Sequence, residues 1–223
     1  MERRVFDKLQ YVVKEPGKPA EKNPAIIFLH GAGTRGTDIG VLERNSFFKE
    51  NSHISDEDSP FMVFAPLCSR DSWFDVFEQL QEFVKMVAAH PAVDANRLYL
   101  VGNSMGGYGS WQLAMTMPEY FAALVPVCGG GMSWNVKRLI HIPVWAFHGK
   151  DDKTVPPEQS IFMVDKLNSV GGNARLTLLD NTAHNSWDYT YAQQELFDWM
   201  LEQRNVDTPV GQDMEYADSK RFG

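Results

Sequence analysis

The 223-residue chain has little of what several classes of protein require. Its two cysteines, Cys68 and Cys128, fit no metal or disulfide pattern and follow apolar runs, as small core residues do. The 21 lysines and arginines are outnumbered by 29 aspartates and glutamates, and the net charge of −8 argues against nucleic acid as a partner. No apolar run is long enough to span a bilayer, and the amino terminus has no apolar stretch resembling a signal peptide. We therefore expect a cytoplasmic protein without a membrane span.

The pattern of apolar segments indicates an α/β fold. With 43% hydrophobic residues the chain can bury one sizeable core, and we expect a single domain over residues 1–223 whose tail, residues 204–223, is loose. Short apolar runs alternate with longer amphipathic segments, as in a mostly parallel sheet with helices on both faces. Buried strands are expected at residues 25–29, 61–65, 98–101, 122–127, 143–147 and 175–179, an edge strand at 9–13, and helices at 72–89, 105–117, 157–170 and 191–203, with residues 37–50 partly helical.

The most informative segment runs from Gly102 to Gly106, with the sequence Gly-Asn-Ser-Met-Gly. It follows an expected strand and precedes an expected helix, which is the context of the G-x-S-x-G nucleophile elbow. Such a turn exposes a strained serine, and its backbone comes so close to neighbouring backbone that glycine is needed on either side. Ser104 is therefore the predicted nucleophile of a hydrolase.

A serine nucleophile of this kind needs a base that follows it in the chain, in the order Ser, then Asp or Glu, then His. Of the six histidines, three precede Ser104, His141 precedes its strand, and His148 comes before the acidic candidates. His184 follows the last expected strand, at the edge where ligands of parallel sheets bind. We therefore predict His184 as the base.

The acid should lie on the loop after the fifth buried strand, and two adjacent aspartates, Asp151 and Asp152, compete for this role. Neighbours in a loop point in different directions, so one carboxylate is expected to orient the imidazole and the other to face water. The spacing alone does not choose between them.

The oxyanion hole is expected in the glycine-rich turn after the first buried strand, residues 29–36, together with the N–H group of Met105. This turn also contains Gly31-Ala-Gly-Thr-Arg-Gly36, which has the form of the dinucleotide-binding fingerprint G-x-G-x-x-G. That alternative needs an acidic residue at the end of the next strand, where the sequence reads Val63-Phe-Ala-Pro66.

These segments together resemble the α/β-hydrolase superfamily over nearly the whole chain. More closely, the chain resembles the carboxylesterase, phospholipase-like and "predicted peptidase" branch near dienelactone hydrolases and feruloyl esterases. The segments that carry the resemblance are residues 29–38, 65–68 with Trp73, 102–111, 143–156 and 184–187. In the family pattern H-G-x-x-D-x-x-V-P the aspartate is the catalytic acid, which implies Asp152. The same resemblance implies the Ala32 N–H group as the first oxyanion donor. Dienelactone hydrolases proper use a cysteine nucleophile, so Ser104 disfavours that activity.

The expected activity is hydrolysis of a small-molecule carboxylic ester through an acyl-enzyme, without cofactor or metal. Thioester or peptide cleavage by the same residues is an alternative, and a non-catalytic binding protein of the same fold is another. Trp73, Trp134 and Trp187 are predicted to line the substrate pocket, although aromatic residues at such positions often belong to the core or the rim.

Overall fold

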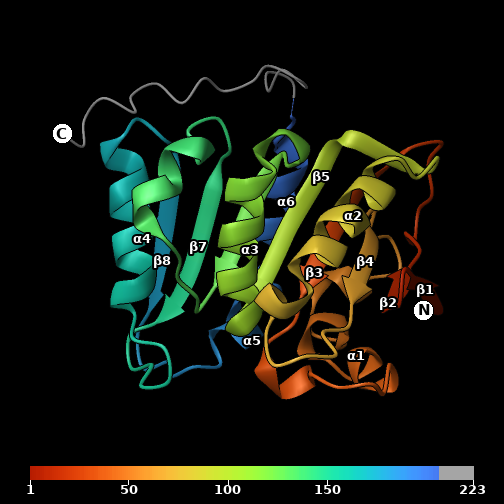
Figure 1. Cartoon of the computed structure of the whole chain (residues 1–223), viewed down its shortest axis with the longest axis horizontal. Helices are drawn as coiled ribbons and strands as arrows, with labels where there is room; N and C mark the ends of the chain where they lie inside the picture. Colours follow the sequence, from red (N-terminus) through yellow and green to blue (C-terminus); the bar gives the residue numbers. More distant parts are fainter. Residues whose placement is uncertain (206–223) are drawn as a thin grey trace.

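The computed structural model describes residues 1–205, which form an eight-stranded sheet of order β1-β2-β4-β3-β5-β6-β7-β8 (Figure 1). The strands from β4 to β8 in this order are parallel, and β2 is antiparallel to both β1 and β4. The strands are β1 (Glu2–Phe6), β2 (Leu9–Lys14), β3 (Asn23–Leu29), β4 (Met62–Pro66), β5 (Val93–Asn103), β6 (Ala123–Val127), β7 (Val144–Gly149) and β8 (Ala174–Leu179).

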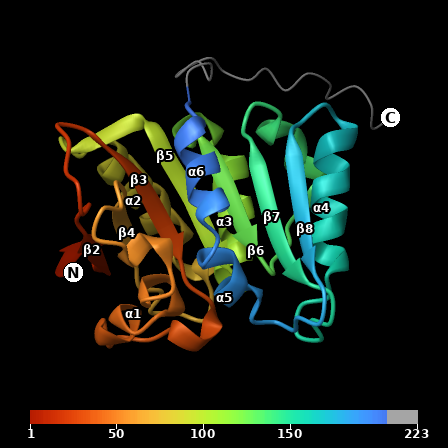
Figure 2. The ribbon, with the colours of Figure 1, turned by 180° about the vertical axis from the view of Figure 1, so that it is seen from behind.

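Helices cover both faces of the sheet, as Figures 1 and 2 show from opposite sides. The helices are α1 (Gly40–Glu43), α2 (Phe77–Ala88), α3 (Met105–Thr116), α4 (Glu158–Ser169), α5 (Ser186–Tyr191) and α6 (Gln194–Glu202). Side chains of α2, α3 and α4 share one apolar core with the sheet, and those of α1, α5 and α6 share the other. The predicted fold class is therefore confirmed.

The strands serve both cores because successive side chains of a strand point to opposite faces. In β3, Ile27 and Leu29 join the core under α2 and α3, whereas Ile26 and Phe28 join the core under α5 and α6. All of β3 is buried, which explains why it reads as a continuous apolar run in the sequence.

Several boundaries differ from the sequence-based expectations. The predicted helix over residues 191–203 is α6, which begins at Gln194, and α5, which ends at Tyr191, lies in a segment where no helix was expected. The predicted helix over residues 72–89 begins as the 3-10 helix η4 (Trp73–Val76) and continues as α2. Strand β1 corresponds to none of the expected strands.

The expected loose tail falls mostly outside the described residues, which end at residue 205. Its first two residues contact the body of the protein. The Asn205 N–H donates to the Asn96 carbonyl at 2.8 Å, and the Arg204 guanidinium lies 3.7 Å from the Asp94 carboxylate. Among residues 1–205, no helix combines the length and the apolar character that crossing a membrane requires.

Candidate active site

Ser104 occupies a strained turn between β5 and α3. Its φ of +54° and ψ of −118° are unusual for a residue with a side chain. A Cβ at Gly102 would overlap the Gly106 carbonyl, and a Cβ at Gly106 would overlap the Leu29 carbonyl. Both flanking glycines are therefore required by close backbone approach, and the turn presents Ser104 at the carboxyl edge of the parallel strands.

His184 lies on the loop between β8 and α5 and contacts both Ser104 and Asp152. Its Nε2 is 2.8 Å from Ser104 Oγ, and its Nδ1 is 2.7 Å from Asp152 Oδ2. An ionised carboxylate only accepts hydrogen bonds, so Nδ1 carries the hydrogen and Nε2 accepts from the serine hydroxyl. The structure thus brings His184 together with two side chains that are 80 and 32 residues away from it in the chain.

Asp152 is held on the loop after β7 by hydrogen bonds to both carboxylate oxygens. Its Oδ1 accepts from the N–H groups of Thr154 and Val155, each at 2.9 Å. Burial alone would raise the pKa of Asp152, but the hydrogen bonds from His184, Val155 and Thr154 outweigh it and lower the pKa below its ordinary value. The carboxylate is therefore charged at neutral pH, as a partner for an imidazole requires.

The loop that carries Asp152 is tied to the loop that carries His184. The Asp151 N–H donates to the Thr182 carbonyl at 3.0 Å, and a Cβ at Gly149 would overlap the carbonyls of Thr182 and Ala183. Asp151 itself is exposed. The two loops are packed so closely that the relative position of Asp152 and His184 is set by backbone contacts.

The expected oxyanion donors begin two helical segments beside Ser104. Ala32 is the first residue of the 3-10 helix η1 (Ala32–Thr34), and Met105 is the first residue of α3. N–H groups at these positions have no acceptor within their own helix and are available to a ligand. A Cβ at Gly31 would lie 3.4 Å from the Ser104 Cβ, which places the loop after β3 directly against the serine.

His30 holds the loop after β3 in place through hydrogen bonds of its ring. Its Nδ1 donates to the Gly31 carbonyl at 2.8 Å, and its Nε2 accepts from the Cys68 N–H at 3.0 Å. Burial lowers the pKa of His30 to about 4, so the ring is neutral and both nitrogens are satisfied. The Trp73 Nε1–H donates to the His30 carbonyl at 3.0 Å.

The structure places the three predicted pocket tryptophans in different environments. Trp73 has no exposed surface, so it supports the His30 loop and is not expected to contact a substrate. Trp187 packs edge-on against His184 with the ring centres 5.3 Å apart. Trp134 is 74% exposed on the 3-10 helix η6 (Ser133–Leu139).

Sequence reasoning missed His148 as a site residue. This buried residue near the end of β7 places its Nε2 3.2 Å from Asp152 Oδ2. Its position four residues before the acid was visible in the sequence, but the order of triad residues set it aside as a base. A contact with the acid is a different role, which chain order does not exclude.

Cys128 also lies near the site, directly after β6, with a φ of +40°. Its Sγ and ligand atoms of Asp152 and His184 lie within 4.8 Å of one another. Burial, above all, raises the pKa of the Cys128 thiol to about 12, and the facing atoms of Asp152 and His184 already bond each other at 2.7 Å. A cysteine binds a metal as its thiolate, and the other ligand atoms must be free to face the ion. These residues therefore fit a metal site poorly.

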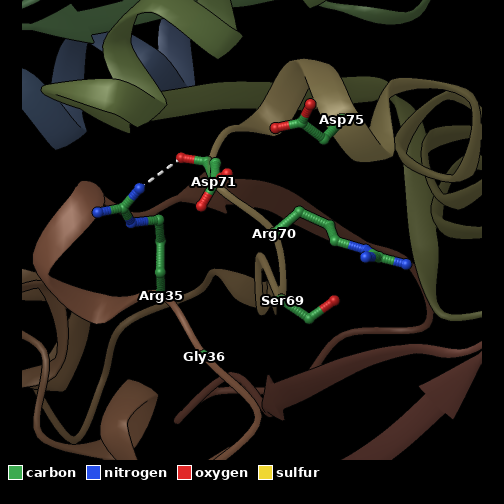
Figure 3. Close-up of a pocket in the computed structure, with 6 residues that line it drawn as sticks. All are labelled: Arg35, Gly36, Ser69, Arg70, Asp71 and Asp75. Atoms are coloured by element: carbon green, nitrogen blue, oxygen red, sulfur yellow. Dashed lines mark hydrogen bonds between the residues drawn. The ribbon is translucent and has the colours of Figure 1, made fainter.

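A separate hollow of about 640 Å³ lies beside the η1 loop (Figure 3). Its lining residues are Arg35, Gly36, Ser69, Arg70, Asp71 and Asp75. The Arg35 guanidinium is engaged with the Ala32 carbonyl at 2.9 Å and the Asp71 carbonyl at 2.6 Å. The Arg35 and Arg70 side chains point away from each other in Figure 3, so they do not converge on one anion.

The same loop tests the dinucleotide alternative. A fingerprint of that kind places phosphates at the amino end of a helix, whose N–H groups and dipole bind them. Here the glycine-rich turn contains η1, which has only three residues, and the next helix, α1, has only four. The loop therefore offers no helix terminus for a pyrophosphate.

The sheet order, the elbow and the loop positions are those of the α/β-hydrolase class. The family model of dienelactone hydrolases matches residues 43–191, more than half of the chain and a span that includes Ser104, Asp152 and His184. The chain belongs to the dienelactone hydrolase family. The resemblance found in the sequence is confirmed at this level.

Solved structures with the same fold include several hydrolases. A thermostable esterase is 34% identical with a TM-score of 0.77; the match covers 88% of this chain and 59% of the esterase, so this chain spans less than two thirds of it. Est1E from Butyrivibrio proteoclasticus with bound ferulic acid is 14% identical with a TM-score of 0.66, covering 91% of this chain and 99% of Est1E. An acylaminoacyl peptidase from Pyrococcus horikoshii is 17% identical with a TM-score of 0.62, covering 96% and 43%. No curated protein matches the chain.

Proposed function

We propose that this protein is a serine hydrolase that cleaves carboxylic esters through an acyl-enzyme. Ser104 is the nucleophile, His184 the general base, and Asp152 the carboxylate that orients the imidazole. The observation that carries the proposal is the 2.8 Å distance between His184 Nε2 and Ser104 Oγ, with the other ring nitrogen held by Asp152. A base in hydrogen-bond reach of a strained, partly exposed hydroxyl is the arrangement that nucleophilic catalysis needs.

In the proposed reaction, Ser104 Oγ attacks the ester carbonyl carbon while its proton passes to His184 Nε2. The carbonyl oxygen becomes an oxyanion, which accepts hydrogen bonds from the Ala32 and Met105 N–H groups. The bond to the leaving alcohol then breaks, and His184 donates the proton to that alcohol. A water molecule attacks the acyl-enzyme with His184 again as base, and collapse of the second intermediate releases the acid and returns the proton to Ser104.

The substrate class is part of the proposal. The thermostable esterase at 34% identity supports esters over thioesters and peptides, because the peptidase neighbour is 17% identical and shares only the fold. Trp187, which packs on His184, and the exposed Trp134 are the proposed aromatic contacts for the substrate. The second candidate function is binding without catalysis, which the close approach of base and hydroxyl disfavours.

A fluorophosphonate probe tests the nucleophile directly, since it reacts only with an activated serine. We expect covalent labelling at Ser104 in the wild-type protein, no labelling of Ser104→Ala, and a loss of ester hydrolysis of roughly 10⁴-fold or more in that variant. Ester hydrolysis within about tenfold of wild type in a folded Ser104→Ala variant would exclude Ser104 as the nucleophile.

A substrate panel separates the ester from its alternatives. Matched p-nitrophenyl esters of rising acyl length, a hydroxycinnamate ester, a thioester and a peptide amide should be compared by kcat/KM. We expect the esters to be preferred. A higher kcat/KM for the thioester or the amide would show that this bond, and not the ester, is the preferred substrate. Labelling without turnover of any substrate would favour a binding protein.

A further inference from the structure

His148 links three segments around the acid of the proposed triad. It lies in β7 without exposed surface, and its Nδ1 is 2.7 Å from the hydroxyl of Ser160 on α4. Its Nε2 is 2.9 Å from the Val155 carbonyl and 3.2 Å from Asp152 Oδ2. Both ring nitrogens therefore have a partner; Val155 and Asp152 lie on the loop after β7, and Ser160 lies on α4.

The partners determine where the hydrogens lie. A carbonyl and a carboxylate only accept hydrogen bonds, so Nε2 must carry a hydrogen; it donates this hydrogen to the Val155 carbonyl at 2.9 Å, with Asp152 Oδ2 3.2 Å away. Burial lowers the pKa of His148, although its contacts with Val155 and Asp152 oppose the shift, and the ring is neutral at physiological pH. In that ring Nδ1 is an acceptor and takes the hydroxyl hydrogen of Ser160.

The Nε2–H group also lies beside the carboxylate of Asp152. Oδ1 accepts from two backbone N–H groups, and Oδ2 faces both His184 Nδ1 at 2.7 Å and His148 Nε2 at 3.2 Å. A carboxylate held at both oxygens has one orientation. Without the second imidazole, Oδ2 would be fixed only by His184, the group whose position it is meant to control.

We propose that His148 is a positioning residue that orients Asp152 toward His184, an inference that rests on the proposed function. Ser160 Oγ also lies 2.9 Å from the Gly129 carbonyl, so its single hydroxyl hydrogen is shared between that carbonyl and His148 Nδ1. A Cβ at Gly129 would lie 2.7 Å from the Cα of Gly107 on α3, so this loop packs directly behind the turn of Ser104. Ser160 therefore places His148 beside the loop that packs behind Ser104.

Two substitutions of His148 separate hydrogen bonding from packing. His148→Leu fills the space without a donor, and we expect kcat to fall roughly 10- to 100-fold, the scale for a misplaced catalytic group, while KM stays within about twofold. His148→Gln keeps an N–H donor on a side chain of similar reach, and we expect kcat within about threefold of wild type. Equal losses in both folded variants would mean that the ring only packs, and a kcat of His148→Leu within about twofold of wild type would exclude the role.

Ser160→Ala keeps the proposal testable if His148→Leu does not fold. This change leaves the ring in place but removes its hydroxyl partner, and we expect kcat to fall several-fold, between about three- and tenfold. Ser169→Ala is the matched control, because Ser169 lies on the same helix, is exposed, and bonds only the Lys166 carbonyl among the described residues. Equal kcat values for Ser160→Ala and Ser169→Ala would overturn the proposal.

A measurement that needs no turnover distinguishes this inference from the proposed function. In downfield proton spectra, the N–H between His184 and Asp152 should give a resonance that disappears in His184→Gln. We expect this resonance to shift or broaden in His148→Leu and to be retained in His148→Gln. If the wild-type protein cleaves no ester but the resonance behaves in this way, the proposed function fails while the positioning role stands. An unchanged resonance in a folded His148→Leu variant would contradict the positioning role whatever the activity.

Discussion

Asp151 and Asp152 are adjacent in the chain, but the first faces solvent and the second is buried. The Asp152 side chain is fully enclosed and bonds His184 at 2.7 Å, whereas Asp151 is exposed and contributes only its backbone N–H to the neighbouring loop. The carboxylate that could orient the base is therefore Asp152, the residue that the family resemblance implied.

Replacement of each aspartate by asparagine tests this difference. Asp152→Asn removes the charge that orients His184 and stabilises its protonated form, and we expect kcat to fall on the order of 10⁴-fold. Asp151→Asn should change kcat less than about tenfold, because an exposed carboxylate adds only a weak, screened field. Steady-state kinetics on both variants, with circular dichroism as the check of folding, measures the effect. A larger loss in Asp151→Asn would show that the acid is Asp151 instead.

The backbone contact between Gly106 and Leu29 gives a prediction about stability. A Cβ at residue 106 would overlap the Leu29 carbonyl and lie 2.8 Å from the His30 carbonyl, both backbone atoms of a buried strand end. Gly106→Ala should lower the free energy of unfolding by about 3 kcal/mol, the upper range for overpacking, as measured by urea denaturation.

Gly33→Ala is the matched control for Gly106→Ala. Gly33 lies in the glycine-rich loop beside the elbow, and a Cβ added there would meet no atom within 4 Å. Its substitution should change the free energy of unfolding by no more than about 0.5 kcal/mol. Similar losses of unfolding free energy in the two variants would show that the close backbone approach does not require glycine at position 106.

Much of the fold and of the candidate site was predictable because local sequence patterns indicate it. The elbow, the late histidine and the glycine-rich loop each combine a residue type with a position after an apolar strand, and this combination predicted their places. Strand β1 carried no such signal. Its residues are mostly exposed, and its turn places Lys8 at positive φ after Asp7, where glycine would be expected.

The remaining differences depend on tertiary packing. Asp151 and Asp152 are chemically identical, and only the contact between the two loops buries one of them. The 3.2 Å approach of His148 Nε2 to Asp152 Oδ2 arises because the loop after β7 folds back on its own strand, which hydrophobic periodicity does not describe. The sequence does not distinguish Trp73 from the other two tryptophans as a pocket residue, because its burial against His30 depends on the tertiary structure.

Acid should destabilise the protein through His30. Its pKa is lowered to about 4 in the folded state from an ordinary value near 6.5, so the unfolded state binds more protons between these pH values. Stability is therefore full above about pH 6.5 and is lost as the pH falls toward 4, by at most about 3 kcal/mol from this residue. Burial lowers the pKa of His148 as well, which adds a loss of the same sign.

Urea denaturation of the wild-type protein and of His30→Gln at a series of pH values between 7 and 4 measures this contribution. The variant should lose less stability across the range than the wild-type protein. An identical pH dependence in the two proteins would show that His30 does not take up a proton on unfolding.

Substitution of Trp73 should affect the stability of the protein, whereas substitution of Trp187 should affect catalysis. Trp73→Phe removes the donor to the His30 carbonyl and should lower the free energy of unfolding by about 1–2 kcal/mol. Because Trp73 has no exposed surface, KM should stay within about twofold of wild type.

Trp187 is half-buried, and its ring packs edge-on against the imidazole of His184, which is why we propose it as an aromatic contact for the substrate. Trp187→Ala should therefore lower kcat/KM by roughly tenfold, since the substrate loses an aromatic contact and the imidazole loses a packing partner. Trp187→Phe keeps a ring at this position and should recover most of that loss. Steady-state kinetics on one ester and thermal unfolding of all three variants separate the two roles. If Trp73→Phe raised KM and Trp187→Ala changed only stability, the substrate would lie on the Trp73 side of the loop.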